Sequence, residues 1–308
     1  MTRHFLRDDN LSPAEQAQVL DLAARLKADR FLAKPLQGPK TVAVIFDKTS
    51  TRTRVSFAVG IADLGGVPLI MDAQGSQMGA KESIADTARV LERQVAAIVW
   101  RTYAHSGLEE MAEHSSVPVV NSLSDDYHPC QILADLLTIL EHKDKLRGLK
   151  FAYVGDASNN MANSYLIGMA LAGMHVAVAG PSKYLPNAAI VARAQEIAAE
   201  QGGSILVTTD AAEALVGADV VATDTWISMG QEDEKEQRIA DFAGFTIDEN
   251  LMAKANDDAI FLHCLPAYRG YEVSAAVIDG NQSVIWDEAE NRLHAQKALL
   301  VWLDGHRG

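Results

Sequence analysis

One short stretch of the sequence combines hydroxyl and guanidinium groups at the point where a predicted strand ends and a predicted helix begins. The residues are Ser50-Thr51-Arg52-Thr53-Arg54, which follow the apolar run 41–46 and precede a helix-like run over 55–61. Free N–H groups and the dipole at a helix N-terminus favour an anion, and arginine binds phosphate oxygens bidentately. The stretch therefore predicts a phosphate site. The alternative is a serine N-cap with two solvated arginines, and the spacing is not that of a nucleotide-binding P-loop.

Other polar residues follow further predicted strands. Ligands of parallel α/β proteins bind beyond the carboxyl ends of the strands, so these residues are candidates for the same chemistry. They are Arg101, the run His128-Pro129-Cys130-Gln131, Asn160, Asp224 with Ser228 and Met229, and the run His263-Cys264-Leu265-Pro266. Each has an ordinary alternative: a surface arginine, a turn histidine, a solvated glutamine, a capping Asn or Asp, or an inert buried thiol. Arg292, on the last predicted helix, is a further candidate, and its ordinary alternative is a solvated arginine.

Composition limits the class of protein. The chain of 308 residues is long enough for two domains of about 150 residues. A net charge of −14 argues against nucleic acid and anionic membranes as partners. The N-terminus does not have the pattern of a signal peptide, and no apolar run approaches the ~18 residues that span a bilayer. The only cysteines, Cys130 and Cys264, do not make a disulfide scaffold, which predicts a cytoplasmic protein.

The order of apolar runs predicts an α/β fold made of two tandem parallel-sheet domains. Strands are expected at 41–46, 67–71, 96–100, 117–120, 149–154, 174–179, 204–208, 218–223 and 259–262. Helices are expected from the capping box Ser12-Pro13-Ala14-Glu15 onward and at 52–64, 83–92, 106–113, 130–142, 160–172, 187–200, 211–216 and 287–304. A charged turn at 143–148 separates the two series.

The stretch from Trp226 to Phe245 interrupts this alternation. Gly230 and Gly244 lie near its ends, and a highly charged run, 232–238, lies between them. It is equally well interpreted as an exposed helix or as a mobile lid, because long polar loops in compact domains often cover sites.

Taken together, these segments resemble the ornithine carbamoyltransferases, a branch of the aspartate/ornithine carbamoyltransferase family. The resemblance runs across nearly the whole chain, including Gly75-Ser76-Gln77-Met78-Gly79 and the region of Arg292. The Ser-Thr-Arg-Thr-Arg segment is shared with the aspartate branch and so indicates only carbamoyl phosphate. The Ser228-Met229-Gly230 and His263-Cys264-Leu265-Pro266 segments are typical of the ornithine branch.

The resemblance implies a role for each candidate. Carbamoyl phosphate would be bound by Ser50, Thr51, Arg52, Thr53, Gln77, Arg101, His128, Pro129, Cys130, Gln131, Cys264, Leu265 and Arg292, with Gln77 supplied by a neighbouring subunit. Ornithine would be bound by Asn160, Asp224, Ser228 and Met229. Arg101, His128 and Cys264 are the expected catalytic residues. No metal and no cofactor are expected.

The resemblance also implies an organisation. Residues 1–142 would form a carbamoyl-phosphate domain and residues 143–286 an ornithine domain, with the helix 287–308 packing back onto the first. The expected partners are carbamoyl phosphate, L-ornithine and further copies of the chain in a trimer with shared sites. The expected role is in arginine metabolism, in the cytoplasm.

Three other functions remain open at this point. A carbamoyltransferase for aspartate, putrescine or an N-acylated ornithine would share the phosphate site. Asp224 disfavours aspartate, which needs cations for its second carboxylate. A nucleotide-dependent dehydrogenase or nucleotide-binding module would use the turn Gly155-Asp156-Ala157, which lacks the G-x-G-x-x-G spacing. A catalytically inactive binding protein would not need so complete a set of polar groups.

Overall fold

The computed structural model describes residues 2–72, 82–228 and 230–306. The chain forms two compact units. The first comprises residues 1–137 together with 289–308, and the second comprises residues 138–288. Two helices, α5 (Pro129–Lys143) and α12 (Ile285–Gly305), contribute residues to both units. The first unit is therefore discontinuous in sequence, whereas the second is one continuous stretch.

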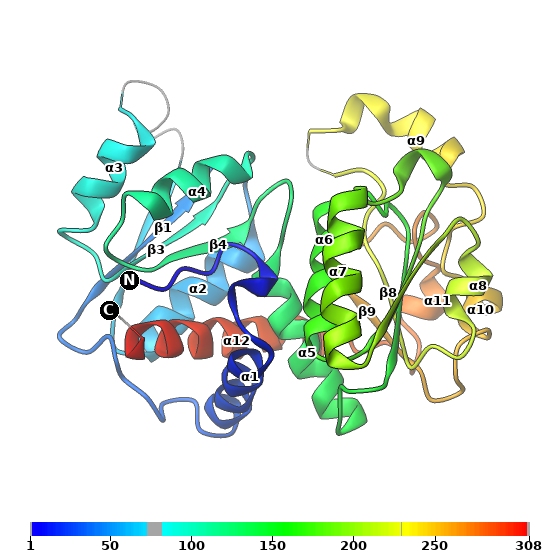
Figure 1. Cartoon of the computed structure of the whole chain (residues 1–308), viewed down its shortest axis with the longest axis horizontal. Helices are drawn as coiled ribbons and strands as arrows, with labels where there is room; N and C mark the ends of the chain where they lie inside the picture. The colour runs from blue at the N-terminus through cyan, green and yellow to red at the C-terminus, as the bar shows by residue number, and fades with distance from the viewer. Residues whose placement is uncertain (1, 73–81, 229, 307–308) are drawn as a thin grey trace. The chain divides into compact units, whose positions relative to one another are not determined.

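The first unit is built on a four-stranded parallel sheet in the order β2-β1-β3-β4. The strands are β1 (Thr41–Phe46), β2 (Val67–Asp72), β3 (Ala97–Arg101) and β4 (Val119–Leu123). The helices are α1 (Pro13–Ala28), α2 (Thr51–Asp63), α3 (Ile84–Leu91) and α4 (His105–Glu113), and a 3₁₀ turn, η1, spans Asp8–Asn10. In Figure 1, α3 and α4 lie over one face of the sheet and α2 over the other.

Local sequence signals explain several of these elements. Ser12 caps α1: its side chain accepts from the Glu15 amide at 3.3 Å, while Glu15 accepts from the Ser12 amide at 2.8 Å. This capping box confirms the prediction from the spacing. The C-terminal helix is held within the first unit by Lys297, whose fully buried ammonium donates to Asp63 at 3.2 Å. Arg30, which is half exposed, pairs with the same carboxylate at 2.8 Å.

The second unit is built on a five-stranded parallel sheet in the order β7-β6-β5-β8-β9. The strands are β5 (Lys150–Val154), β6 (His175–Ala179), β7 (Ser204–Thr208), β8 (Val220–Thr223) and β9 (Ile260–His263). The helices are α6 (Asn160–Leu171), α7 (Ala188–Gln201), α8 (Ala211–Leu215), α9 (Lys235–Asp241), α10 (Glu249–Met252) and α11 (Ala275–Ile278), with 3₁₀ turns η3 (Ser182–Tyr184) and η4 (Glu232–Glu234). Helices α6 and α7 cover one face, and α8, α10 and α11 the other (Figure 1).

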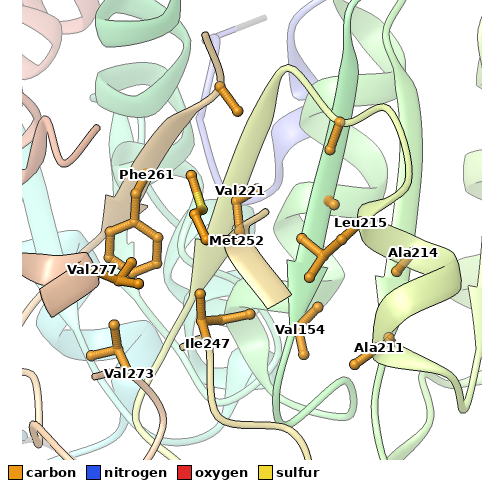
Figure 2. Close-up of a cluster of buried hydrophobic side chains, with 14 of the residues drawn as sticks. Val154, Ala211, Ala214, Leu215, Val221, Ile247, Met252, Phe261, Val273 and Val277 are labelled. Carbon is orange, nitrogen blue, oxygen red and sulfur yellow. The ribbon is translucent and has the colours of Figure 1, made fainter. Parts of the chain in front are cut away.

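A buried apolar cluster lies between the second sheet and the helices α8, α10 and α11. Figure 2 shows Val154 and Val221 of the sheet beside Leu215 of α8, with Phe261 and Met252 nearby. Burying an aliphatic or aromatic side chain of this kind contributes about 1.5–3 kcal/mol. The core thus fixes the strands whose ends carry the polar residues discussed below.

The predicted α/β fold of two parallel sheets is confirmed, and each of the nine predicted strands overlaps an observed one. The helices α10 and α11 were not predicted, because a helix of four residues carries little periodicity. Helix α9 lies in the stretch for which an exposed helix was one of the two interpretations. Within the described part of the chain, no helix is both long and apolar enough to span a bilayer.

Candidate active site

The predicted phosphate segment lies at the switch point of the first sheet. From β1 the chain goes to β2 on one side, and then to β3 and β4 on the other. Such a reversal leaves a crevice beyond the carboxyl ends of the two central strands, where α/β proteins bind ligands. The segment 50–53 follows β1, and Arg101 ends β3, where the register with β4 shifts between Trp100 and Arg101. Irregularities of this kind re-aim side chains near active sites.

The start of α2 holds the hydroxyl residues. Ser50 is the N-cap, and its hydroxyl oxygen accepts from the Thr53 amide at 3.2 Å. Thr53 is fully buried, and its hydroxyl oxygen accepts from the Arg292 guanidinium at 2.6 Å. Arg292 comes from α12 and is only 3% exposed. Arg292, which lies more than two hundred positions away in the sequence, therefore contacts this strand-to-helix turn. The alternative of a solvated arginine is wrong for Arg292.

The two arginines of the segment have different surroundings. Arg54 forms an ion pair with Asp72 at the end of β2, and its guanidinium lies 4.7 Å from the centre of the Phe46 ring. These contacts hold Arg54 toward the edge strand. Arg52 is one of three arginines whose charges act on His128. The predicted cationic role is thus best carried by Arg52.

His128 lies close enough to Arg292, Arg101 and Arg52 for their charges to affect its pKa. It immediately precedes α5 and is 3% exposed. Burial lowers its pKa well below the usual value of 6.5, and the charges of Arg292, Arg101 and Arg52 lower it further. The imidazole is therefore neutral at physiological pH, with one N–H donor and one acceptor nitrogen. A neutral donor among three guanidiniums is suited to a ligand with negative charge.

The first turn of α5 carries the other predicted residues of this segment. Pro129 is the first helical residue, where its missing N–H costs nothing. The buried Cys130 thiol donates to the Asn121 carbonyl at 3.3 Å, and burial raises the pKa of Cys130 to about 12. Cys130 is thus a protonated, structural thiol. Gln131 is fully buried, and its amide nitrogen donates to Asp135 one turn later at 2.8 Å.

The second sheet has a switch point of its own, between β5 and β8. Asp224 follows β8 and is 8% exposed, and Cys264 follows the neighbouring strand β9. One oxygen of Asp224 accepts from the Thr225 amide at 2.8 Å and from the Cys264 thiol at 3.3 Å. Burial raises the pKa of Asp224. Thr225 and Cys264 thus donate to the same oxygen of the Asp224 carboxylate. A buried carboxylate of this kind suits an amine as ligand.

His263 holds the turn that carries Cys264. Its Nδ1 accepts from the Leu265 amide at 2.9 Å, so the hydrogen lies on Nε2, which faces Glu272 at 3.2 Å. Leu265 has a φ of 59°, a left-handed conformation that non-glycine residues adopt at some cost. In the described part of the chain, Asp224, His263 and Cys264 also form the one group of three or more such residues whose potential metal-ligating atoms lie within 4.8 Å of one another. The prediction that no metal takes part stays a prediction.

Two further ornithine candidates, Asn160 and Ser228, follow the two strands of this switch point, β5 and β8. Asn160 is the first residue of α6, but the capping role belongs to Asn159, whose side chain accepts from the Ala162 amide at 2.8 Å. The capping alternative for Asn160 is therefore wrong. The Ser228 amide donates to the Gln231 side chain at 3.1 Å. Gln77 and Met229, both predicted to bind substrate, lie outside the described residues.

Sequence reasoning missed a buried ion pair behind these residues. Arg238, in α9, pairs with Asp156, which follows β5, and both side chains are less than 5% exposed. The same guanidinium donates to the Trp226 carbonyl and lies over the rings of Tyr184 and Phe242. The charged run over 232–238 was interpreted as solvated or mobile, and no local pattern marks one of its residues as buried. Through its contacts with Trp226 and Asp156, Arg238 connects the segment after β8 to the loop that leads into α6.

Comparison with known families gives the site its context. The carbamoyl-P binding domain of the aspartate/ornithine carbamoyltransferases matches residues 3–141, and the Asp/Orn binding domain of the same family matches residues 147–303. This chain belongs to the aspartate/ornithine carbamoyltransferase family. The family resemblance inferred from the motifs is thereby confirmed, and the protein is a carbamoyltransferase by descent.

Curated relatives and solved structures agree. The chain is 68% identical over 303 residues to an ornithine carbamoyltransferase of Clavibacter sepedonicus, covering 98% of this chain and 99% of the relative. It is 60% identical over 307 residues to one of Corynebacterium glutamicum, covering 98% and 96%. The ornithine carbamoyltransferase of Pyrococcus furiosus superposes with a TM-score of 0.95 at 46% identity, covering 99% and 98% of the two chains. An anabolic one of Campylobacter jejuni gives 0.93 at 44%, covering 99% and 100%.

Proposed function

We propose that this chain is an ornithine carbamoyltransferase, which converts carbamoyl phosphate and L-ornithine into L-citrulline and phosphate. The observation that supports this most directly is the cluster at the first switch point. There, the charges of three guanidinium groups act on a neutral, buried His128, and one of them, Arg292, donates to Thr53 in the first turn of α2. A compact dianion with a neighbouring carbonyl oxygen matches such a cluster.

In this proposal the first unit binds carbamoyl phosphate. The N–H groups at the start of α2, with the Ser50, Thr51 and Thr53 hydroxyls and Arg52, hold the phosphoryl group. Arg101 and His128 donate to the carbamoyl oxygen, with Arg292 beside them through its bond to Thr53. Gln131 binds the carbamoyl nitrogen. Pro129 and Cys130 shape the turn that presents His128 and Gln131.

The second unit binds ornithine in this proposal. The buried carboxylate of Asp224 recognises an α-ammonium group, and Asn160, Ser228 and Met229 complete the binding of the α-amino and α-carboxylate groups. Cys264 and Leu265 border the reacting amine and the carbamoyl group. The hydrogen bond from Cys264 to Asp224 links these two parts of the proposed subsite.

The chemistry follows from this inventory. The neutral δ-amine attacks the carbamoyl carbon, and negative charge develops on the former carbonyl oxygen. Donors such as Arg101 and His128 stabilise that oxyanion, each by about 3 kcal/mol. The bond from carbon to the phosphate oxygen then breaks, and the leaving phosphate takes the proton lost by the amine. The remaining catalysis is positioning of the two reactants.

One assay separates this function from its close alternatives. Purified protein is incubated with carbamoyl phosphate and, in parallel, ornithine, aspartate, putrescine or N-acetylornithine, and ureido product is measured. We expect product with ornithine at a rate at least 100-fold above the other amines, because leaving a buried charged site unpaired is costly. Greater turnover of another amine would overturn the proposal.

The phosphate site has its own test. Arg52→Ala should lower turnover by about 100-fold or more, as expected for loss of a preorganised charged donor. Arg89→Ala is a matched control, since Arg89 is an exposed arginine on α3 paired with Asp86. A folded Arg52→Ala protein with turnover close to that of the control would exclude the proposed role.

We further propose that the protein is a homotrimer with shared active sites. The edge strand β2 exposes Val67 and Leu69, each 44% accessible, and Val55 of α2 is 54% accessible. Among the described residues β2 ends the sheet, and a closed ring of subunits would cover these apolar side chains. Leu69→Glu should lower the solution mass, whereas Val216→Glu, on an exposed residue of the second unit, should not.

Sharing of the sites rests on Gln77, which the proposal assigns to the neighbour's carbamoyl phosphate. Subunits carrying Arg52→Ala and subunits carrying Gln77→Ala are then defective in different halves of a site. Dissociating and reassembling a mixture should restore activity above the mean of the two parents. If mass measurements verify reassembly and activity stays at the mean, Gln77 does not act across subunits.

The cellular setting is part of the same proposal. Formation of citrulline from ornithine is a step of arginine biosynthesis, and we assign the protein to the cytoplasm, where its two free cysteines would remain reduced. The substrates are small molecules, and the acidic charge of −14 disfavours nucleic acid as a partner. Fractionation of the producing cell, with the citrulline-forming activity followed, tests the location.

A further inference from the structure

A tyrosine near the end of β5 has no role in the function described so far. Tyr153 is fully buried, and its ring packs against the Tyr165 ring of α6, with the ring centroids 5.5 Å apart. The Tyr153 hydroxyl donates to the Asp156 carbonyl at 3.3 Å and accepts from the Asn159 side-chain amide at 3.1 Å. Burial raises the pKa of Tyr153 well above its usual value of 10, so the hydroxyl keeps its hydrogen. One neutral group thus holds the loop between β5 and α6 at two points.

The hydroxyl and the first turn of α6 together fix which way the Asn159 amide faces. The Asp156 carbonyl can only accept, so the hydroxyl hydrogen points to it, and Asn159 presents its NH₂ group to the hydroxyl oxygen. The Asn159 oxygen accepts from the Ala162 amide at 2.8 Å, as the N-cap of α6. Asn160, a proposed ornithine ligand, is the next residue and the first of α6. The Tyr153 hydroxyl therefore anchors the turn that presents Asn160.

The same hydroxyl lies at the switch point of the second sheet. A Cβ atom added to Gly155, just beyond β5, would lie 3.5 Å from the Tyr153 hydroxyl oxygen and 3.2 Å from the hydroxyl oxygen of Thr223, the last residue of β8. The charge of Asp224, which follows Thr223, adds to the rise in the pKa of Tyr153, so the carboxylate lies near the tyrosine. The anchored loop and the proposed amine-binding carboxylate therefore occupy the same end of the sheet.

We propose that Tyr153 is a positioning residue for the amino-acid end of ornithine, because its hydroxyl anchors the turn from which Asn160 binds the substrate. The inference rests on the proposed function and on the assignment of Asn160 to the α-amino and α-carboxylate groups. Without the hydroxyl the loop loses two hydrogen bonds and occupies further conformations, of which only a fraction binds the α-groups. The apparent affinity for ornithine then falls in proportion to that fraction. Carbamoyl phosphate, assigned to the first unit, does not depend on this loop.

Tyr153→Phe tests the proposal, since it removes the hydroxyl and keeps the ring. For each protein we would measure the KM values of ornithine and carbamoyl phosphate, each with the other substrate saturating, and the inhibition constant of L-norvaline, which is ornithine without its δ-amine. The ornithine KM and the norvaline constant should rise together by about tenfold, as expected for the loss of two hydrogen bonds. The carbamoyl phosphate KM should change by less than about twofold.

Asn159→Ser breaks the same link from the other side. Serine is as good an N-cap as asparagine, but its shorter side chain does not reach the Tyr153 hydroxyl. It should also raise the ornithine KM, and Tyr153→Phe/Asn159→Ser should stay within about threefold of Tyr153→Phe, because the two changes break one shared hydrogen bond. Two independent losses of stability would instead multiply their effects, and that result would overturn the inference.

Tyr165→Phe is the matched control. It removes the hydroxyl of another fully buried tyrosine of the second unit, and it should leave the ratio of the two KM values unchanged. A folded Tyr153→Phe protein with the wild-type ratio, or with an equal rise of both KM values, would overturn the inference. A wild-type protein that forms no citrulline would instead refute the proposed function.

Discussion

Breaking the buried ion pair between Arg238 and Asp156 should make local opening of α9 more frequent. The Arg238 and Asp156 side chains are 4% and 3% exposed, so removing the cation leaves an uncompensated buried carboxylate. Breaking such a pair costs about 3–5 kcal/mol, and Arg238→Met retains most of the aliphatic contact with the Tyr184 and Phe242 rings. At about 1.4 kcal/mol per tenfold, local opening should become roughly 100- to 4,000-fold more frequent.

Hydrogen exchange measured by mass spectrometry reads out this opening. Peptides covering 235–242 should exchange faster by that factor in Arg238→Met, while peptides covering β5 serve as an internal reference. The double variant Arg238→Met/Asp156→Asn should recover most of the protection, because the buried charge is also removed. Arg193→Met is a control, since Arg193 forms an exposed pair with Glu196 that is worth well under 1 kcal/mol.

A functional consequence should accompany the faster exchange. Arg238 joins the stretch that carries Ser228 to the loop before Asn160, so the KM for ornithine should rise more than the KM for carbamoyl phosphate. If exchange over 235–242 in Arg238→Met stays within about threefold of the wild type, the ion pair does not hold α9 and the reasoning is wrong.

Four further outcomes follow from the same structure. Because the pKa of His128 is lowered in the folded protein, stability should be full above pH 6.5 and fall as the pH drops below that value, with a smaller slope in His128→Asn when unfolding midpoints are measured from pH 8 to 5. Iodoacetamide at pH 8 should leave Cys130 unmodified in the folded protein, as peptide mapping would show, because its thiol stays protonated. Lys297→Met should lower the free energy of unfolding by about 1–3 kcal/mol, more than Arg30→Met in parallel denaturant titrations, because Lys297 is fully buried and Arg30 is half exposed. The kcat/KM for ornithine should rise nearly tenfold per pH unit from pH 6 to 8, since only the neutral δ-amine attacks and a primary amine of this kind has a pKa of about 10.4; a flat profile in initial-rate assays would contradict that scheme.

Much of the fold was predictable because parallel strands are buried on both faces. Such strands appear as continuous apolar runs, as in β1 and β5, and they can be found without knowing their neighbours. Their order in the sheet could not be obtained this way, because it depends on pairing between distant segments. The switch points between β1 and β3 and between β5 and β8 therefore emerge only from the structure.

The candidate site was predictable where its residues sit at strand ends. Arg101 and Asp224 each follow a predicted apolar run directly, and Ser50 lies between such a run and a helix-like run, so position alone marks all three. Arg238 gave no such signal, since its burial depends on Asp156, which lies 82 residues away. Tyr153 was missed for a different reason: a tyrosine inside an apolar strand is ordinarily a core residue, and only its hydrogen bonds to the loop before α6 distinguish it.

The division of the chain has a consequence for its synthesis. Residues 138–288 are contiguous and leave the ribosome before residues 289–308, so the second unit has all of its residues available before the first unit does. The first unit cannot be completed at that stage, although most of it has already emerged, because residues 289–308 belong to it. Thr53 and Asp63 are synthesised long before Arg292 and Lys297, which donate hydrogen bonds to them in the folded first unit. The proposed phosphate site is thus completed last, and a nascent chain that stops short of α12 lacks Arg292, one of the cations assigned to that site.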